Sequence, residues 1–405
     1  MPTEKLEFEG HAGDRLAARL DRPTGPIRAV ALFAHCFTCS KDIAAARRIA
    51  GRLAGTGIAV LRFDFTGLGH SEGEFANTGF TSNVQDLVLA ATHLDGLGMA
   101  PQLLIGHSLG GAAVLAAAGR IASAKAVVTI GAPFDPGHVL ESFGASLEEI
   151  REKGAAEVDL AGRKFTIGKG FVEDVSQARL TEAVAGMRRA LLVLHAPRDA
   201  QVSIDNAGAI FSAAKHPKSF VTLDNADHLM TREQDAEYAA DVIAAWAPHY
   251  LDLAPEPAKP TAPDGVTRVS EAHADGFLQD IAFSDGLYLR ADEPRSVGGK
   301  GLGPTPYQLV TAGLGACTAM TIRMYARRKG WPLAHVSVDV SHDREHIRDC
   351  EGCEDAPQRI DVFRRVIRFE GPLDEAQRAR LLEIADRCPV HRTLEAEARI
   401  ETTLA

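Results

Sequence analysis

The sequence predicts an α/β protein: a doubly wound, mostly parallel sheet with a small cap insertion, followed by a separate α+β domain. Three observations lead to this fold class. In the first half, short β-branched runs alternate with alanine-rich segments of helical period, which is typical of repeated β-α-β units. From Leu253 to Gly265 four prolines fall within thirteen residues, as in a semi-rigid linker. Beyond this linker, strands flank one long apolar helix. We therefore expect domains over residues 1–252 and 266–405, joined by a linker over 253–265.

The strands expected in the first domain are apolar over most of their length, as in strands buried on both faces of a sheet. They are Arg28–Ala34, Ile58–Phe63, Gln102–Gly106, Ala126–Ile130, Ala190–His195 and Ser219–Leu223. Helices are expected between them at Asp42–Ala54, Ser82–Leu97, Leu109–Ile121, Asn206–Ala214 and Arg232–Trp246. The segment Asp135–Ala185 is longer than an ordinary crossover and contains a hairpin signal, EVDLAGRKFTI. It predicts the cap insertion, over about residues 135–185.

The second domain has a different pattern, with strands in succession rather than alternating with helices. Strands are expected near Arg268–His273, Phe277–Phe283, Gly286–Ala291, His335–Asp343, Ile360–Glu370 and Ala396–Thr403. Helices are expected at Pro306–Lys329 and Asp374–Asp386.

Charge and hydropathy exclude several classes of protein. Lysine and arginine number 44 against 54 aspartates and glutamates, so the net charge is −10, and there is no basic run. Nucleic acid and anionic membranes are therefore poor partners. No apolar stretch approaches the roughly 20 residues that span a bilayer, and the first residues lack the apolar core of a signal peptide. We expect a cytoplasmic protein that needs no cofactor.

The clearest chemical motif is Gly106-His107-Ser108-Leu109-Gly110, directly after an expected strand and before an expected helix. Glycines at both ends of such a G-x-S-x-G sequence permit a strained turn that exposes the serine hydroxyl, and the next amide points toward a developing oxyanion. We expect Ser108 to be a nucleophile and the amide of Leu109 to be an oxyanion donor. The plain alternative is a helix N-cap serine.

A serine nucleophile needs a base and an acid that orients the base. We expect His228 to be the base and Asp199 the acid, because each follows a late strand. Asp199 follows the strand Ala190–His195, and His228 follows the strand Ser219–Leu223. Asp227 is adjacent to His228 in the chain, so its side chain would point away from the ring. Further competing acids are Asp205 and Asp224, and His107 and His195 are expected to be structural or pocket-lining residues.

The second oxyanion donor should come from the loop His35-Cys36-Phe37-Thr38 after an early strand, and we expect it to be the amide of Phe37. Together with the segment Phe63–Ser71 (FDFTGLGHS) and the serine, acid and histidine elements in order, this loop resembles the α/β-hydrolase family over residues 1–252. The resemblance implies a serine esterase that acts on a small-molecule ester. The insertion Asp135–Ala185 is expected to act as a small cap whose apolar side chains select the acyl or alcohol group. Cys36 stands where that family usually has glycine.

Two cysteines of the second domain occupy distinctive positions. Cys317 lies within the expected helix Pro306–Lys329, and Cys388 opens the sequence Cys-Pro-Val-His. A lone cysteine is most often a small core residue. The helix entry Gly303-Pro304-Thr305-Pro306-Tyr307 and the later Cys-Pro-Val, however, resemble the OsmC and organic hydroperoxide resistance family over about residues 266–405.

The OsmC resemblance implies that Cys317 is a peroxidatic thiol, Cys388 its resolving partner and an organic hydroperoxide the substrate. It also implies a homodimer through this domain, and the glycines and alanine of the long helix, Gly313, Gly315 and Ala316, would give a close-approach surface. Tyr307 stands where active family members carry a glutamate. Arg290 and Arg295 precede the helix, but neither matches the family's arginine securely.

Other cysteine pairs leave alternatives open. His342, His346, Cys350 and Cys353 are ligand types suited to zinc, but their spacing is loose. The plainer explanation is surface histidines beside an acidic loop, and a redox disulfide between Cys350 and Cys353 is an alternative to zinc, so we assign no metal. For Cys36 and Cys39, packing or pocket lining is expected.

Three functions therefore compete. The first is a serine carboxylesterase fused to an OsmC-like domain with weak peroxidase activity. The second is mainly a thiol peroxidase. In the third, the OsmC-like half is a non-catalytic dimerisation module that shapes the esterase pocket.

Overall fold

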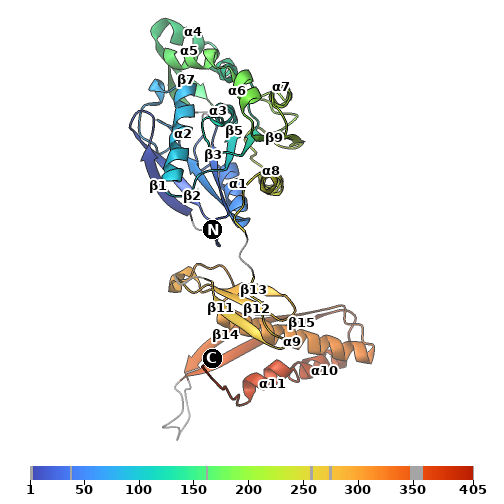
Figure 1. The fold of residues 1–405 in the computed structure, drawn as a ribbon. Helices are drawn as coiled ribbons and strands as arrows, with labels where there is room; N and C mark the ends of the chain where they lie inside the picture. The colour runs from blue at the N-terminus through green and yellow to red at the C-terminus, as the bar shows by residue number, and fades with distance from the viewer. Residues whose placement is uncertain are drawn as a thin grey trace. The chain divides into compact units, whose positions relative to one another are not determined.

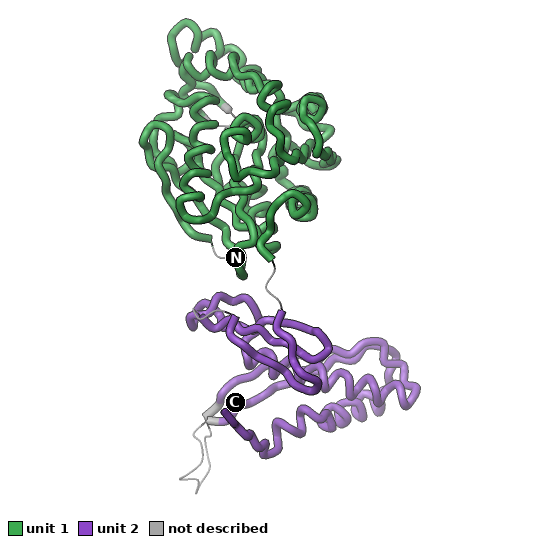
Figure 2. Tube along the Cα trace, viewed as in Figure 1, with its two compact units in different colours: residues 1–257 green, residues 258–405 purple. Residues whose placement is uncertain are grey.

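The computed structural model describes residues 3–36, 39–160, 163–255, 259–272, 276–346 and 359–404. The chain forms two compact units, residues 1–257 and 258–405 (Figure 2). Within its described residues, no helix is both long and apolar enough to cross a membrane.

The first unit is built on one sheet of eight strands in the order β1-β2-β4-β3-β5-β6-β9-β10 (Figure 1). The strands are β1 (Thr3–Glu9), β2 (Arg15–Asp21), β3 (Ala29–Ala34), β4 (Ile58–Phe63), β5 (Leu103–His107), β6 (Ala126–Ile130), β9 (Ala190–His195) and β10 (Lys218–Thr222). All neighbours from β4 to β10 are parallel, and β1 and β2 add an antiparallel edge. The predicted doubly wound sheet is confirmed. The sequence pattern missed both strands. β1 is an exposed edge strand in which charged residues alternate with a few apolar ones, and in β2 the apolar run begins only after Arg15 and is interrupted by Arg19.

Helices cover both faces of this sheet. One face packs against α1 (Ala44–Gly55) and α8 (Glu233–Trp246), with the short η3 (Ala247–His249) after them. The other packs against α2 (Phe80–Gly96), α3 (Leu109–Ala117) and α7 (Asp205–Ala213), with η1 (Phe75–Asn77) ahead of α2. Successive residues of β3 alternate between the two cores, which explains its unbroken apolar run. Because both faces are covered, the loops at the carboxyl ends of the strands are where a ligand can approach.

The predicted insertion after β6 is a small cap. It consists of η2 (Pro136–Phe143), α4 (Ser146–Lys153), β7 (Ala155–Leu160), β8 (Arg163–Gly168), α5 (Lys169–Gln177) and α6 (Leu180–Gly186). The hairpin expected from EVDLAGRKFTI is the antiparallel pair β7–β8. Phe143, Phe171 and Val175 join the core beneath α2 and α3, and the amide and hydroxyl of Thr81 in α2 donate to Asp174 in α5. The cap therefore packs on the α2–α3 face of the sheet.

The second unit combines strands and helices, as the predicted α+β class requires. A three-stranded antiparallel sheet contains β11 (Thr267–Glu271), β12 (Gln279–Phe283) and β13 (Tyr288–Ala291), and β14 (His335–His346) pairs with β15 (Arg359–Glu370). The helices are η4 (Arg295–Val297), α9 (Pro306–Lys329), α10 (Glu375–Ala385) and α11 (Pro389–Glu395). α9 has the predicted bounds, because Thr305 and Gln308 form a capping box at its start and Gly330, with φ +65°, ends it.

The strand expected at Ala396–Thr403 is wrong. Residues 389–395 form α11, and residues 397–404 have no regular secondary structure. A strand needs a hydrogen-bonding neighbour, and none of the described strands pairs with this segment. The alternation of apolar and polar residues could not show whether such a neighbour exists.

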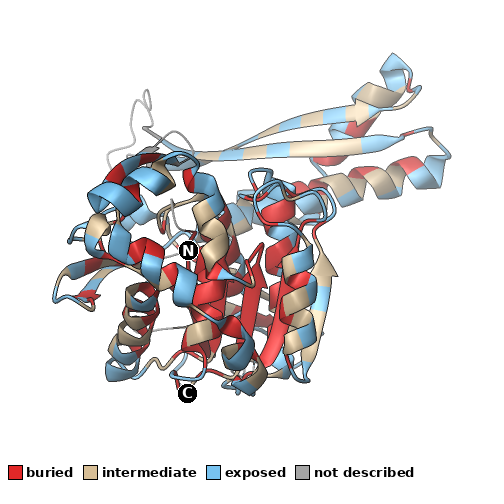
Figure 3. Cartoon of the chain, turned by 90° about the horizontal axis from the view of Figure 1, so that it is seen from above, coloured by how far each residue is buried: buried red, intermediate tan, exposed pale blue. Residues whose placement is uncertain are grey.

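Large apolar side chains stay exposed in the second unit. Only five of the 24 residues of α9 are buried within the described part of the chain: Leu314, Gly315, Thr318, Ile322 and Ala326. Met320 and Met324 on the same helix are 65% and 71% exposed. Figure 3 shows the difference between the buried central strands of the first unit's sheet and the partly exposed long strands of the second unit. The second unit thus leaves large apolar side chains exposed that its own core does not bury.

Candidate active site

Ser108 lies at the turn between β5 and α3, with φ +55° and ψ −127°. Few residues other than glycine adopt a positive φ, so the turn is strained. A Cβ on Gly106 would come within 2.3 Å of the Gly110 carbonyl oxygen, and a Cβ on Gly110 within 2.4 Å of the His35 carbonyl oxygen. Both glycines of the motif are therefore required for the close approach of β5, α3 and the loop after β3.

The structure brings Ser108, His228 and Asp199 together. Nε2 of His228 lies 3.0 Å from Oγ of Ser108, and Nδ1 lies 2.7 Å from Oδ2 of Asp199. The side chains of His228 and Asp199 are only 5% and 1% exposed. Three residues far apart in the sequence thus form a continuous hydrogen-bonded chain from a carboxylate to a serine hydroxyl.

The carboxylate of Asp199 is held by its own loop as well as by His228. The amides of Gln201 and Val202 donate to Oδ1 at 2.8 and 3.0 Å. Burial raises the pKa of Asp199, but the hydrogen bonds from His228 and from these amides outweigh it, and the pKa lies below its usual range. Asp199 is therefore a carboxylate near neutral pH.

The competing acids lie away from the imidazole. Asp227 accepts hydrogen bonds from the amide and hydroxyl of Thr231, and Asp205 begins α7 beside Ser203. Asp224 is exposed in the same turn as Asp227.

Sequence reasoning missed Gly131, which follows β6 with φ +56°. A Cβ there would lie 3.3 Å from Oδ2 of Asp199 and 3.5 Å from Nδ1 of His228. Any side chain at this position would be strained and would press on the acid–base pair. A glycine directly after a buried strand was the signal that could have revealed it.

Of the two expected oxyanion donors, Leu109 lies among the described residues. Leu109 is the first residue of α3, so its amide has no acceptor within the helix and is free to bind an oxyanion. Phe37 lies outside the described residues. On either side of it, Cys36 and Cys39 form a disulfide with a Cα–Cα distance of 5.3 Å, where packing or pocket lining was expected. Cys36 does also line the cavity at Ser108.

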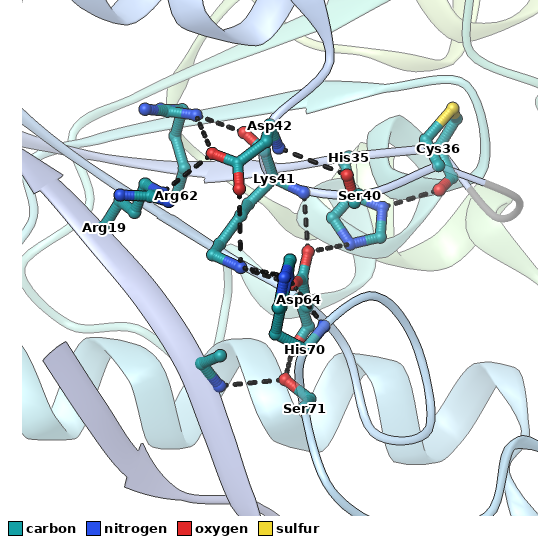
Figure 4. Close-up of polar contacts among 12 residues, drawn as sticks. Arg19, His35, Cys36, Ser40, Lys41, Asp42, Arg62, Asp64, His70 and Ser71 are labelled. Carbon is teal, nitrogen blue, oxygen red and sulfur yellow. Dashed lines mark hydrogen bonds and ion pairs between the residues drawn. A yellow bond between two sulfur atoms is a disulfide. The ribbon is translucent and has the colours of Figure 1, made fainter. Parts of the chain in front are cut away.

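A buried ionic network anchors the segment that follows this disulfide (Figure 4). Lys41 donates from both its amide and its ammonium group to Asp64, at 2.6 Å each, and the amide of His70 also donates to Asp64. Asp64 is fully buried and Lys41 only 4% exposed. Burial raises the pKa of Asp64, but the hydrogen bonds from Lys41 more than offset this, so the pKa is lowered. Arg62 donates to the Lys41 carbonyl and to Asp21, which extends the network toward the sheet edge.

A cavity of about 450 Å³ opens at Ser108 and His228. The cap contributes to its lining, as predicted, with η2 and β7. Apolar side chains of the cap were expected to select the acyl or alcohol group, but among the described cap residues that line the cavity only Val139 is apolar, and the others are His138, Glu141, Ser142 and Asp159. The sequence shows which cap residues are apolar but not which way they face. Most of them pack against α2 and α3 and not into the cavity.

In the second unit the structure brings Cys317 and Cys388 together, although 70 residues separate them in the chain. Their thiols are hydrogen-bonded to each other, and neither forms a disulfide. Burial and the neighbouring thiol raise the pKa of Cys317. Burial also acts to raise the pKa of Cys388, but hydrogen bonds from Cys317, the His391 amide and Thr318 lower it overall.

Sequence reasoning missed an arginine that is linked to this pair through Thr318. Arg365 on β15 donates to the hydroxyl of Thr318 at 3.1 Å, and Thr318 in turn bonds Cys388. The expected candidate Arg290 instead bonds Asp280 and Tyr288. Tyr307 accepts a hydrogen bond from Arg344 and stacks on His342. An arginine in the middle of a long strand gave no sequence signal for a role beside a thiol.

Among the four residues considered as zinc ligands, the structure describes the side chain of His342. His342 bonds Asp361 at 2.8 Å, whereas Cys350, Cys353 and the side chain of His346 lie outside what the structure describes. Within the described ranges no group of three or more ligand side chains is placed to hold a metal ion.

Comparisons with known proteins identify a family for each of the two units. The alpha/beta hydrolase family matches residues 31–242, and the OsmC-like protein family matches residues 299–403. An esterase domain from a Rhodothermus marinus protein is 48% identical, with a TM-score of 0.51, over 62% of this chain and 99% of that domain. Est1E from Butyrivibrio proteoclasticus, bound to ferulic acid, is 21% identical with a TM-score of 0.54, over 60% of this chain and 98% of Est1E, and shows the shared fold.

A third comparison is with an uncharacterized protein of Escherichia coli O157:H7, YfhR, which is 23% identical over 56% of this chain and 73% of its own length. The chain belongs to the alpha/beta hydrolase family and carries an OsmC-like domain in its second half.

Proposed function

We propose that the first unit is a serine carboxylesterase in which Ser108, His228 and Asp199 form the catalytic triad. The observation that carries the proposal is the hydrogen-bonded chain from Asp199 through His228 to Ser108. The strained turn at Ser108 and the similarity to the Rhodothermus marinus esterase domain support it.

The geometry suits acyl transfer. Ser108 Oγ attacks the ester carbonyl carbon while His228 Nε2 takes the hydroxyl proton, and Asp199 stabilises the imidazolium that forms. The amide of Leu109, and by the sequence prediction that of Phe37, would hold the tetrahedral oxyanion. The imidazolium then protonates the departing alkoxide, which leaves an acyl-enzyme on Ser108. Water attacks that ester with His228 again as base, and the acid is released.

The polar part of the cavity lining bears on the substrate. His138, Glu141, Ser142 and Asp159 place hydrogen-bonding groups on the cap side of Ser108. The ring of His138 already has protein partners, because its Nε2 donates to the Gln201 carbonyl and its Nδ1 lies 3.4 Å from Oε1 of Glu141. We infer that the preferred esters carry a polar or hydroxylated group that faces the cap, because a purely aliphatic chain would remove water from the exposed Glu141 carboxylate and Ser142 hydroxyl without offering them new hydrogen bonds.

Active-site labelling tests the proposal. A fluorophosphonate probe should modify Ser108 alone, and wild-type protein should hydrolyse p-nitrophenyl esters in an acyl-chain series. Protein that hydrolyses these esters with Ser108 unlabelled would contradict the mechanism.

A second activity is favoured by the contact between Cys317 and Cys388. We propose a slow thiol peroxidase in which Cys317, the more accessible sulfur, attacks an organic hydroperoxide. The O–O bond breaks, an alcohol leaves and Cys317 becomes a sulfenic acid. Cys388 then attacks that sulfur, water leaves and a disulfide forms, which an external dithiol must reduce. The hydrogen bonds that lower the pKa of Cys388 favour the thiolate needed for this second step.

Treatment of reduced protein with one equivalent of cumene hydroperoxide should give a Cys317–Cys388 disulfide by peptide mapping. In Cys388→Ser the sulfenic acid should persist and react with dimedone at Cys317. Dimedone labelling confined to Cys388 in the Cys317→Ser variant would reverse the two roles. Two free thiols after treatment would leave this domain without a peroxidase function and favour a dimerisation module.

The exposed apolar surface of the second unit leads us to propose a homodimer formed through this domain. The partner chain would cover Met320 and Met324, which are exposed in the single chain. Gly315 was expected to belong to this contact surface, but it packs on Val340 of its own unit and is buried. Light scattering at micromolar concentration should give twice the mass of one chain. Met324→Asp should weaken the dimer, because it would bury a carboxylate, and Leu97→Asp in the first unit should not. A monomer mass for the wild type would contradict the proposal.

A further inference from the structure

Two buried histidines lie beside the triad without belonging to it. His107 is the last residue of β5, directly before Ser108, and His195 is the last residue of β9, four residues before Asp199. Both side chains are fully buried, and neither lines the cavity at Ser108. A polar side chain is costly to bury in an alanine- and leucine-rich core, so its hydrogen bonds show what it does there.

His107 is bonded to the loop that carries the base. Its Nε2 lies 2.6 Å from the main-chain carbonyl oxygen of His228. A carbonyl oxygen only accepts hydrogen bonds, so Nε2 of His107 must carry the hydrogen. This one bond joins the strand end that presents the nucleophile to the main chain of His228.

His195 has the corresponding contact with the loop that carries the acid. Its Nε2 donates to the main-chain carbonyl of Val202 at 2.8 Å. The amide of Val202 in turn donates to Oδ1 of Asp199. Val202 is therefore held at its carbonyl by His195 and at its amide by the carboxylate, which fixes the loop around the acid.

Both rings have the same second feature. Nδ1 of each is buried and has no hydrogen-bond partner among the described residues. Burial lowers the pKa of both histidines, and with the nearby His228 it lowers that of His107 to about 4. A neutral ring leaves only a lone pair at Nδ1, whereas a protonated ring would bury an unpaired N–H group and a charge. Each histidine is thus a neutral donor with a single tautomer.

We propose that His107 and His195 are positioning residues of the triad, which hold the loops of His228 and Asp199 through neutral Nε2–H donors to main-chain carbonyls. The inference rests on the proposed esterase function. Proton transfer between Ser108 and His228 requires a heavy-atom distance of roughly 2.6–3.2 Å, so a small displacement of the base loop slows the chemical step. Since neither histidine reaches the cavity, substrate binding should change little.

The test compares substitutions that keep or remove the donor. His107→Gln retains an N–H group near the position of Nε2, His107→Leu removes it at similar volume, and the amide of His107→Asn is too short to reach the His228 carbonyl. We expect His107→Leu and His107→Asn to lower kcat for p-nitrophenyl ester hydrolysis about tenfold or more, with KM changed less than about twofold. His107→Gln should recover most of kcat.

His195→Leu and His195→Asn should also lower kcat, and His195→Gln should recover most of it, because His195 likewise donates from Nε2 to a main-chain carbonyl, that of Val202. His93→Leu is the matched control. His93 is a partly buried histidine on α2 that stacks on Phe8, and its loss should leave kcat unchanged.

Circular dichroism and thermal melting separate positioning from folding. A purely structural role would lower the melting temperature and leave kcat per folded molecule unchanged, and that result overturns the inference. So does a His107→Gln variant as slow as His107→Leu. If His107→Leu does not fold, the comparison of His107→Gln with His107→Asn decides in the same way.

Failure of this inference can be told apart from failure of the proposed function. Wild-type protein that hydrolyses esters and is labelled at Ser108, together with an unaffected His107→Leu variant, refutes only the positioning role. Wild-type protein that neither hydrolyses esters nor reacts with the probe refutes both.

Discussion

Ser108→Ala is expected to lower kcat for ester hydrolysis by about 10⁴ to 10⁶-fold, because in the proposed mechanism the Ser108 hydroxyl forms the acyl-enzyme. The variant should fold normally. Alanine fits the space of serine, and the strain at φ +55° is a property of the backbone that both residues share. Initial rates with a p-nitrophenyl ester, together with circular dichroism, measure the effect.

Ser123→Ala is the matched control for this substitution. Ser123 donates to the Pro101 carbonyl in a loop of the same unit and does not line the cavity at Ser108. Its activity should equal that of the wild type. A Ser108→Ala protein that retained wild-type turnover would show that the hydrolysis takes place elsewhere.

Asp199→Asn should cost about 10⁴-fold in kcat while leaving the fold intact. An asparagine can turn its amide nitrogen toward Nδ1 of His228, and the ring then carries its hydrogen on Nε2, where it cannot accept the proton of Ser108. The amide oxygen still accepts the hydrogen bonds that the Gln201 and Val202 amides give to Oδ1 in the wild type. The melting temperature should therefore fall only slightly.

Asp227→Asn separates the two candidate acids. Asp227 bonds Thr231 rather than the imidazole, so this variant should keep nearly full activity. A large loss with Asp227→Asn and none with Asp199→Asn would transfer the orienting role to Asp227. The same kinetic assay with equal concentrations of folded protein measures both variants.

The sequence predicted those parts of the fold that depend on local pattern. Buried parallel strands such as β6 and β9 were predicted with their observed bounds, because both faces of each strand are apolar. The chain order of serine, acid and histidine indicated the residues that the structure brings together. The approach of Gly131 to the acid–base pair could not be predicted, because it depends on how β6 lies between β5 and β9.

Contacts between distant segments account for the other failures. Arg365 reaches Thr318 only because β15 lies near α9, and nothing near either residue in the sequence indicates this contact. The polar lining of the cavity by η2 and β7 depends on which side of the cap turns toward the sheet. The absence of a strand at Ala396–Thr403 likewise follows from what lies beside that segment and not from its own residues.

The cap supplies none of the three triad residues and neither glycine of the turn at Ser108, yet it supplies a large share of the cavity wall. Under the proposed esterase function, the bond-breaking residues and the residues that contact the substrate on the cap side lie in separate stretches of the chain. Mutations within residues 136–186 should then change the range of accepted esters and leave the reaction itself intact. Exchange of this one segment, in evolution or in the laboratory, should therefore change substrate specificity while the same catalytic residues are kept.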